Sequence, residues 1–415
     1  MRRLTRVLPP TLLAAGLVLA PAAPAQAEDT ACSDTPPDEV ELAESRGPLP
    51  DLLHLDAAHR VATGRGVGVA VVDTGVSPGA PGAGRVDVRV SETVPGVTGR
   101  VVDTHGTLVA GLVAGRSEDG DALGVAPDAH VVSIKVADAR QGLGDVVNAE
   151  DVVTLSSAWV AAGVRRAIAL REAHRIGVIN LSLNFDEPDP ALASAIRDAI
   201  ARGIVVVASV GNRPEPEGEE PDPETAYEVG EDTVRFPATL PGVIAVTGLG
   251  ADGTLDPSLV WTGPDVDVSA PVRDVVTVNV GGTTCLIQTS GSSWAAAQVS
   301  GLAALVIEEF GPGLTPAQVA TRIRATARGA LRDSALDGHG MIQPREAVTA
   351  LLDIAPNGRL DRAAAYDPPA PRIDPPAVAG NPFANLRAGV LWWGMGAGSL
   401  LLACLILRPL VARRR

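Results

Sequence analysis

Residues 67–75 read Val-Gly-Val-Ala-Val-Val-Asp-Thr-Gly, an uninterrupted apolar run that ends in a carboxylate, a hydroxyl and a glycine. A strand with one face in water alternates apolar and polar side chains, whereas this run contains no polar position before its end. It therefore predicts a central strand covered on both faces, as parallel strands in α/β proteins are. Loops after the carboxyl ends of such strands carry functional residues, which directs attention to Asp73.

Four more apolar runs of this kind follow along the chain, at Val131–Val136, Val178–Leu183, Ile204–Ala208 and Val243–Val246. Helix signals lie between and after them. Asp189-Pro190 is typical of a helix start and Gly203 of its end, while Thr315 and Gln318 have capping-box spacing. This alternation predicts a three-layer α/β domain with a central, mostly parallel sheet and right-handed crossovers.

Composition excludes two broad classes of protein. The 415-residue chain has 46% hydrophobic residues, which is enough apolar side chain for a large core and argues against intrinsic disorder. Its formal net charge is −15, and residues 28–386 alone carry −23 because both ends are basic. A surface this acidic repels phosphate backbones, so we expect no nucleic-acid partner.

The N-terminus has the pattern of an export signal. Residues 1–27 combine three arginines, a short apolar stretch and the small-x-small site Ala25-Gln26-Ala27. We expect cleavage after Ala27, followed by an N-terminal extension over residues 28–51 and a main domain over residues 52–355. The extension is too short for a folded inhibitory prodomain, so we expect it to stay attached and wrap the domain.

The C-terminus predicts a membrane anchor. A Pro-rich linker over residues 356–387 precedes residues 388–407, a charge-free stretch that as a helix would span about 30 Å of hydrocarbon. The basic tail, residues 408–415, should stay on the cytoplasmic side, which leaves the main domain outside the membrane. We therefore expect a single-pass cell-membrane protein whose folded domain is extracytoplasmic.

A carboxylate and an imidazole occupy positions suited to catalysis. Asp73 ends the first strand, and His105-Gly106-Thr107 opens an apolar helix 32 residues later. Asp-Thr-Gly also occurs in aspartic proteases, but this chain has no second copy of the tripeptide. The other histidines, His54, His59, His130, His174 and His339, have no comparable setting and are interpreted as surface or packing residues.

A serine and an asparagine complete the set. Gly291-Ser292-Ser293 opens another apolar helix, where a serine either caps the helix or acts as a nucleophile assisted by the exposed N–H groups. Asn212 follows the strand Ile204–Ala208, where it is either a turn residue or a donor to an oxyanion. The order Asp, His, Ser along the chain is that of subtilisin and differs from that of chymotrypsin.

From about Leu52 to Leu352 the chain resembles subtilisin-family serine proteases. The matching motifs are Val71–Val76, His105–Gly111, Gly124–Pro127, Val178–Leu183, Phe236–Ala238 and Ser269–Pro271. The resemblance implies that Asp73 orients the base, His105 is the general base and acid, Ser293 is the nucleophile and Asn212 holds the oxyanion. It further implies that a polypeptide substrate binds along five residues: Ser182, Leu183, Asn184, Ser209 and Gly211. No metal ion or cofactor is implied.

Four positions depart from the family pattern. Asn184 stands where many relatives have Gly, and Ala297 replaces the usual Pro after the nucleophile. Ser292 and Thr104 replace the usual Thr and Gly. None of these changes removes a catalytic atom, but together they are consistent with a slow or very selective enzyme.

Within the family, the signal peptide, short extension, Pro-rich linker and anchor are similar to those of mycosins, membrane-anchored proteases of type VII secretion systems. This similarity implies an extracytoplasmic endopeptidase that processes secreted substrates. The alternative is a structural subunit that stabilises a secretion complex, with proteolysis secondary. Cys32 and Cys285 either form a disulfide that ties the extension to the domain or remain two free thiols.

Overall fold

The computed structural model describes residues 40–42, 46–79, 84–99, 101, 103–140, 152–213, 235–250, 253–254, 261–287, 291–329, 334–361 and 384–412. The chain divides into one compact unit that ends at Asp361 and a second unit from Arg362 onward. The first unit includes the hairpin of β11 (Asp353–Ile354) and β12 (Leu360–Asp361), beyond the domain end expected at residue 355. Side chains of one helix, α7 (Pro316–Thr326), hold this hairpin: Gln318 donates to the Ile354 carbonyl and Thr321 to the Gly358 carbonyl.

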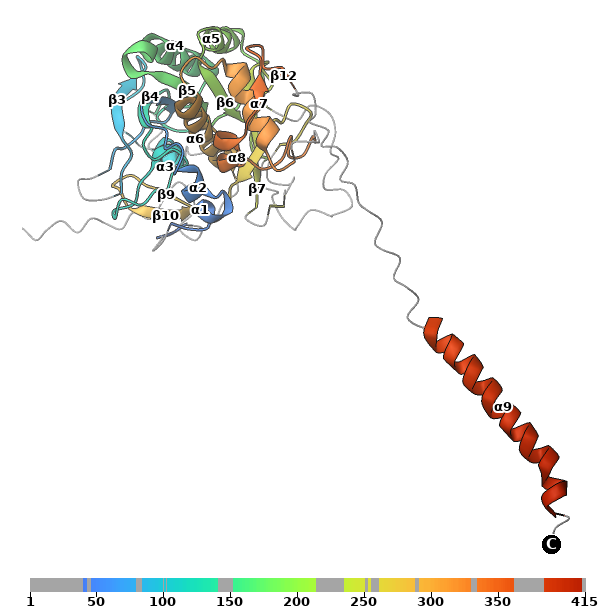
Figure 1. Cartoon of the computed structure of the whole chain (residues 1–415). Coiled ribbons are helices and arrows are strands. Elements are labelled where there is room, and N and C mark those ends of the chain that lie inside the picture. The colour runs from blue at the N-terminus through green and yellow to red at the C-terminus, as the bar shows by residue number, and fades with distance from the viewer. Residues whose placement is uncertain are drawn as a thin grey trace, which may run out of the picture. The chain divides into compact units, whose positions relative to one another are not determined.

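A seven-stranded sheet forms the centre of the first unit (Figure 1). Its strands, in spatial order, are β3 (Val88–Thr93), β4 (His130–Lys135), β2 (Gly68–Asp73), β5 (Ile176–Leu181), β6 (Val205–Ser209), β7 (Val243–Leu249) and β8 (Val268–Pro271). Every neighbouring pair is parallel. The parallel sheet expected from the apolar runs is confirmed, and it gathers the carboxyl ends of its strands at one edge.

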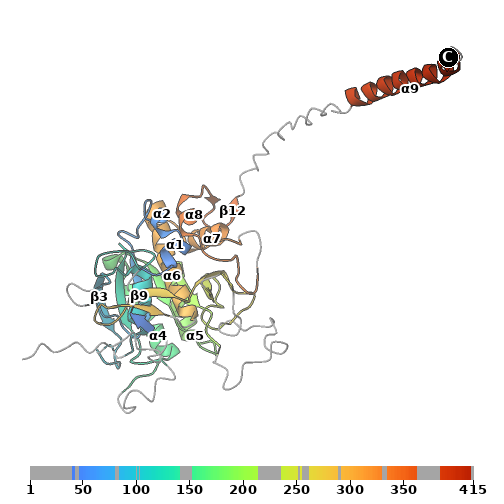
Figure 2. The same cartoon turned by 90° about the horizontal axis from the view of Figure 1, so that it is seen from below.

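Helices cover both faces of the sheet, which completes the three layers. On one face lie α3 (His105–Ala114) and α6 (Ser292–Phe310), and on the other lie α4 (Ser157–His174) and α5 (Pro190–Ala201), as Figures 1 and 2 show. The two layers of side chains form separate hydrophobic clusters, so each face of the sheet is covered by buried apolar side chains. Burial on both faces is the physical reason why apolar side chains dominate the inner strands. The polar side chains that these strands do contain, such as Ser133 and Asn180, are buried as well.

The two helix caps predicted from the sequence are confirmed. Asp189 accepts hydrogen bonds from the backbone of Ala191 and Leu192 and caps α5, and Gly203 follows that helix with φ +80°. Thr315 and Gln318 form the expected capping box at the start of α7. A remaining short helix, α8 (Pro344–Thr349), begins with proline at its first position.

Part of the N-terminal extension packs on the domain. Strand β1 (Val40–Leu42) pairs antiparallel with β10 (Thr284–Ile287), which pairs with β9 (Val275–Val278). The short helices α1 (Leu49–Leu52) and α2 (Leu55–Ala58) follow. Cys285 on β10 is disulfide-bonded. Its expected partner Cys32 lies outside the described residues, so that pairing stays a prediction.

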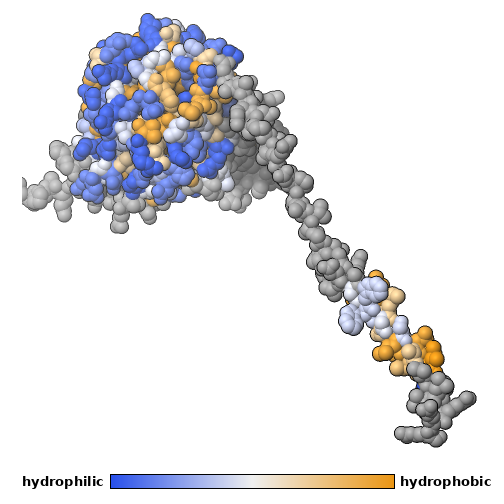
Figure 3. Space-filling view, in the orientation of Figure 1, coloured by the Kyte–Doolittle hydropathy of each residue, from blue (hydrophilic) through white to orange (hydrophobic). Residues whose placement is uncertain are grey.

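The second unit contains α9 (Ala384–Ala412), an apolar helix long enough to cross a bilayer. Its window Gly389–Ile406 has a mean hydropathy of 1.8 and no buried residue, and its apolar surface is orange in Figure 3. The expected span over residues 388–407 lies within this helix. The expected signal peptide, residues 1–27, lies outside the described residues, as does most of the Pro-rich linker.

Two histidines away from α3 predict acid sensitivity of the fold. His59 donates from Nε2 to the Val125 carbonyl at 2.9 Å, and His130 donates to the His174 carbonyl at 2.7 Å. Burial lowers the pKa of both imidazoles in spite of these hydrogen bonds, so the unfolded chain binds their protons more readily. The neutral, buried histidines therefore leave the stability of the fold unreduced above their unfolded pKa of about 6.5, and the stability declines as the pH falls below that value. The total loss for each histidine is about 1.4 kcal/mol for every unit by which its folded pKa lies below its unfolded pKa.

We expect the variant with both His59→Gln and His130→Gln to lose less unfolding free energy than the unsubstituted protein between pH 7 and pH 5. Glutamine keeps an N–H donor but does not titrate. Urea denaturation of the two proteins at both pH values measures the difference. An equal loss in both would contradict the assignment of the acid sensitivity to these side chains.

Candidate active site

The aspartate and histidine singled out in the sequence form a buried pair. Asp73 is the last residue of β2, and His105 is the first residue of α3, which begins on the same edge of the sheet. The imidazole Nδ1 lies 2.9 Å from Asp73 Oδ1, and only 1% of His105 and 2% of Asp73 is exposed. Because the carboxylate accepts a hydrogen bond from Nδ1–H, the neutral ring keeps the Nε2 lone pair free to take a proton.

The Asp-Thr-Gly turn fixes the carboxylate and the helix start against each other. Asp73 Oδ1 also accepts from the backbone N–H of Thr74 at 2.8 Å, and Thr74 Oγ1 accepts from the Gly106 N–H at 3.1 Å. Gly75 has φ +102°, and a Cβ on Gly106 would lie 2.4 Å from the Gly75 carbonyl oxygen. Glycine is thus required at both positions, one for its backbone conformation and one for close approach.

A second carboxylate holds the histidine backbone. Asp103 is 3% exposed, and its Oδ1 accepts from the His105 N–H at 2.9 Å. Its Oδ2 accepts from the Arg140 backbone at 3.1 Å and from Arg140 Nε at 3.0 Å. An acidic side chain close to a helix N-terminus is a recognisable signal, which the sequence interpretation did not use.

A buried lysine supports the turn from the neighbouring strand. Lys135 ends β4 directly opposite Asp73, and its ammonium donates to the carbonyls of Thr74 at 3.1 Å and Ala137 at 2.7 Å. It also forms a 2.9 Å ion pair with Asp138. Burial raises the pKa of Asp138, but hydrogen bonds from Thr98 and Lys135 outweigh this and lower it. As the only lysine in the chain, at the end of an apolar strand, Lys135 was visible in the sequence as an exception.

Ser293 lies in the first turn of α6, and the residue that follows it contacts the His105 ring. The imidazole and the indole of the next residue, Trp294, have ring centroids 5.2 Å apart. Ser293 Oγ donates to the Ser182 carbonyl at 3.2 Å, and Ser182 Oγ donates back to the Ser293 carbonyl at 2.9 Å. Among the described contacts no hydrogen bond joins Ser293 to His105, and the Ser293 hydroxyl instead donates to the Ser182 carbonyl. Catalytic hydrogen bonds are often absent before substrate binds.

Asn212 is oriented by the serine that precedes Ser293. Its Oδ1 accepts from the Ser292 backbone N–H at 2.8 Å and from the Ser292 hydroxyl at 2.9 Å. Ser292 Oγ in turn accepts from the Gly211 N–H at 3.1 Å. With its oxygen held in this way, the asparagine presents its amide nitrogen as a donor near the start of α6. Ser292 is therefore the anchor of Asn212, a role that its position before Ser293 did not reveal.

The five expected substrate-binding residues lie on two adjacent segments. Ser182, Leu183 and Asn184 follow β5, while Ser209 ends β6 and Gly211 lies two residues beyond it. Ser209 Oγ lies 3.5 Å from the Leu183 carbonyl, which links the two segments. Apart from the two cysteines, the site residues expected from the sequence thus all lie at the carboxyl edge of the sheet.

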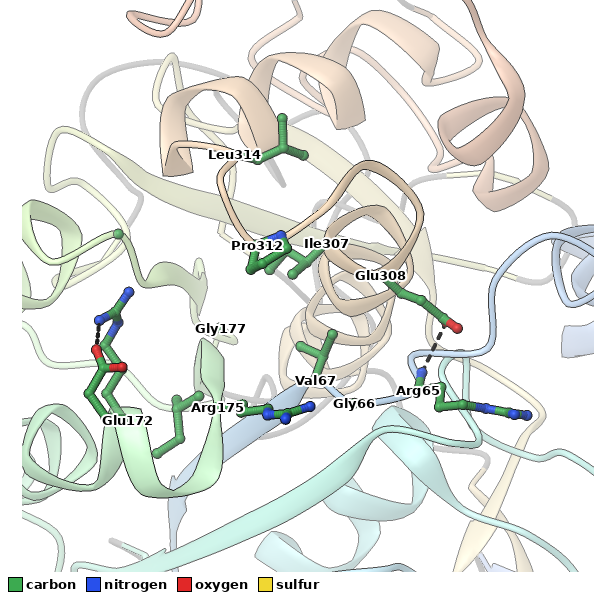
Figure 4. Close-up of a pocket in the computed structure, with 13 residues that line it drawn as sticks. Arg65, Gly66, Val67, Glu172, Arg175, Gly177, Ile307, Glu308, Pro312 and Leu314 are labelled. Carbon is green, nitrogen blue, oxygen red and sulfur yellow. Dashed lines mark hydrogen bonds and ion pairs between the residues drawn. The ribbon is translucent and has the colours of Figure 1, made fainter.

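A separate cavity lies near the opposite, amino ends of β2 and β5 (Figure 4). It measures about 400 Å³ and is lined in part by Arg65, Arg175, Ile307 and Glu308. Glu308 accepts hydrogen bonds from three successive backbone N–H groups, those of residues 63–65. None of the expected site residues lines this cavity. Within the described ranges no group of three or more His, Cys, Asp or Glu side chains is arranged to hold a metal ion.

Comparison with known proteins gives one family. The Subtilase family model matches residues 64–341. Mycosin-1 of Mycobacterium tuberculosis is 37% identical over 363 residues, which cover 78% of this chain and 76% of the relative. The solved structure of the MycP3 protease from the type VII (ESX-3) secretion system has a TM-score of 0.58 and 32% identity, over 77% of this chain and 91% of that one.

A further solved structure is that of the serine protease MycP1, described as an essential component of the type VII (ESX-1) secretion system. It has a TM-score of 0.55 and 29% identity, over 75% of this chain and 94% of that chain.

Proposed function

This chain belongs to the subtilase family and is a subtilisin-like serine endopeptidase, and from this premise we propose that Asp73, His105 and Ser293 are its catalytic triad. The observation that carries the proposal is the buried hydrogen bond between His105 Nδ1 and Asp73, with the ring next to the helix turn that bears Ser293. Burial strengthens this pairing because water does not screen it.

The mechanism begins with a rotation of the Ser293 hydroxyl from the Ser182 carbonyl toward His105. His105 Nε2 takes the hydroxyl proton while Oγ attacks the peptide carbonyl, and Asp73 stabilises the imidazolium. The imidazolium then gives its proton to the leaving amine, which breaks the C–N bond and leaves an acyl-enzyme. The imidazole then deprotonates a water molecule, which attacks the ester carbonyl. The bond between the acyl carbon and Ser293 Oγ breaks, and the imidazolium returns the proton to Oγ.

We assign the oxyanion contact to Asn212 and the N–H of Ser293. The first N–H groups of a helix lack intrahelical partners, so the start of α6 can donate to a developing negative charge. Asn212 Nδ2 adds a second donor because Ser292 holds the amide oxygen on the other side. Donors fixed before the reaction stabilise the transition state without reorganisation.

The variant Asn212→Leu is expected to lower kcat by about 10²–10³-fold with little change in KM, since the lost donor acts only on the oxyanion. Steady-state cleavage of a peptide substrate measures both constants. Ser292→Ala is the matched control: it removes the side-chain anchor but keeps the amide and the backbone donor, so its loss should be smaller. An equal loss in both variants would contradict a direct role for the amide.

We propose that α9 anchors the protein in the cell membrane, with the protease domain outside and the C-terminus in the cytoplasm. Support comes from the exposed apolar window Gly389–Ile406 and from the basic residues that follow it. Resistance to alkaline carbonate extraction tests the anchor. In intact spheroplasts an added protease should digest the domain but spare an epitope fused after Arg415, and loss of the epitope would overturn the orientation.

We further propose that this protein works with a type VII secretion system and processes a secreted polypeptide. The similarity to mycosins supports this role. A structural contribution to the secretion complex is the second candidate, favoured by the description of the similar MycP1 as an essential component of its system. In cells, secretion that survives Ser293→Ala but fails on deletion of the whole chain would favour the structural role.

Labelling of the purified full-length protein by a fluorophosphonate probe tests the enzymatic proposal directly. The probe reacts only with a serine that is activated by an assembled base. We expect labelling at Ser293, located by mass spectrometry of the modified peptide. Labelling elsewhere, or none in a folded preparation, would overturn the triad.

A further inference from the structure

The two segments beside the nucleophile continue a pair of parallel strands. In the β5–β6 register Leu181 lies opposite Ala208, and extending it places Asn184 opposite Gly211. Both segments are tied to the first turn of α6. Ser182 accepts from Ser293 Oγ, and Gly211 donates to Ser292 Oγ. They therefore form two fixed walls that begin at the nucleophile.

In the proposed mechanism, the substrate side chain next to the scissile carbonyl enters between these two walls. With the scissile carbonyl at Ser293 Oγ and its oxygen toward Asn212, the residue that supplies the carbonyl, called P1, lies between the two segments. Its side chain must extend along the gap, away from the hydroxyl. The residues that occupy this gap decide how large a P1 side chain can be.

Asn184 occupies the gap. A Cβ built on Gly211 would lie 2.9 Å from Asn184 Cγ and 3.0 Å from its Oδ1, so the amide packs directly against the Gly211 backbone. The same Cβ would lie 3.0 Å from Cγ of Arg235, whose stem contacts Gly211 as well. Asn184 is half-buried. Its side chain bridges the two walls where a smaller residue would leave them apart.

The structure behind Asn184 resists displacement. The Arg235 backbone donates to the Val210 carbonyl at 3.0 Å, and its guanidinium lies 4.2 Å from the centre of the Trp261 ring. The Arg213 guanidinium lies 4.5 Å from the same ring, and the backbone N–H of Trp261 donates to the Gly211 carbonyl at 3.1 Å. Cation–π contacts and backbone hydrogen bonds join these groups, so moving the wall to admit a large residue would break several contacts.

We propose that Asn184 closes the P1 pocket, so that this protein cleaves after Gly, Ala or Ser and rejects large P1 side chains. The inference rests on the proposed function and specifies its substrate class. Forcing a bulky side chain against a packed wall is unfavourable. Shape exclusion of this kind changes kcat/KM for the large substrate, because the clash persists in the transition state.

The test uses the full-length protein in detergent and a series of peptides that differ only at P1, with Gly, Ala, Ser, Leu, Phe or Lys. We expect kcat/KM for Ala to exceed that for Leu and for Phe at least tenfold. Asn184→Gly should raise the Leu-to-Ala ratio of kcat/KM at least tenfold, and Asn184→Ser should raise it less. Asn357→Gly makes the same exchange in an exposed turn and should leave the ratio unchanged.

Equal cleavage after Ala, Leu and Phe by the unsubstituted protein would overturn the inference, even if every Asn184 variant failed to fold. An unchanged ratio in a fluorophosphonate-labelled Asn184→Gly variant would also overturn it. Labelling of Ser293 separates this failure from failure of the proposed function. A folded protein that neither labels nor cleaves any peptide overturns both.

Discussion

Replacing Ser293 with Ala is expected to remove all fluorophosphonate labelling and to lower kcat for peptide cleavage by about 10⁶-fold. Alanine lacks the oxygen that forms the acyl-enzyme, so no partial reaction can compensate. The fold should be nearly unaffected, because within the described part of the chain the hydroxyl makes one hydrogen bond, to the Ser182 carbonyl, and alanine suits the first turn of a helix. Active-site labelling and progress curves on the full-length protein measure the loss.

A double variant provides the control. If Ser293 and His105 act as one unit, His105→Ala alone and the combination with Ser293→Ala should each have about the same residual kcat as Ser293→Ala. If the kcat loss of the double variant were instead the product of the losses of the two single variants, Ser293 and His105 would contribute independently to catalysis. Activity retained by Ser293→Ala would contradict the assignment of the nucleophile and direct attention to Ser292.

The variant Asp73→Asn is expected to lower kcat by about 10⁴-fold while the fold is retained. Asp73 Oδ1 accepts a hydrogen bond from His105 Nδ1 at an N···O distance of 2.9 Å, and both side chains are almost fully buried. An amide that donates to Nδ1 selects the other tautomer, which carries its proton on Nε2 and cannot act as a base. The amide also lacks the charge that stabilises the imidazolium. Single-turnover cleavage measures the chemical step without interference from product release.

Asp103→Asn makes the same exchange in a neighbouring buried carboxylate and serves as the matched control. An asparagine oxygen can still accept the His105 backbone N–H, and the imidazole keeps Asp73 as its partner. We expect a much smaller loss of kcat than in Asp73→Asn. Equal losses would mean that the two carboxylates act through the local fold and not through the tautomer of His105.

Local patterns were sufficient for the central sheet and for the residues on its edge. Predominantly apolar runs identified five of its strands, because burial on both faces favours apolar side chains. Strand β3 escaped this criterion: it lies at the edge of the sheet with alternating half-buried and exposed residues. The β1–β10 pairing was not foreseen either, since the short strand β1 gains its partner only from a segment far along the chain.

The site residues also divide into those that local sequence predicted and those whose roles depend on tertiary contacts. Asp73, His105, Asn212 and Ser293 stand next to recognisable element ends, so spacing and order could identify them. Asn184 drew attention as a departure from the family, but its consequence depends on contact with Gly211 and Arg235. Asp103 and Ser292 act through hydrogen bonds to the backbone of His105 and to the side chain of Asn212, which local sequence does not reveal.

Sequence by itself determined the parallel α/β architecture, the subtilase resemblance and the identity of the chemical groups, because strand burial and element ends impose their residue types locally. Tertiary structure alone decided which groups meet: that Ser292 turns Asn212, that Lys135 braces the Asp73 turn, that Ser293 rests on Ser182 and that Asn184 fills the gap beside Gly211. Each of these contacts joins residues from different strands or helices. Their distances are fixed by the packing of the whole sheet and its helices, which no local pattern encodes.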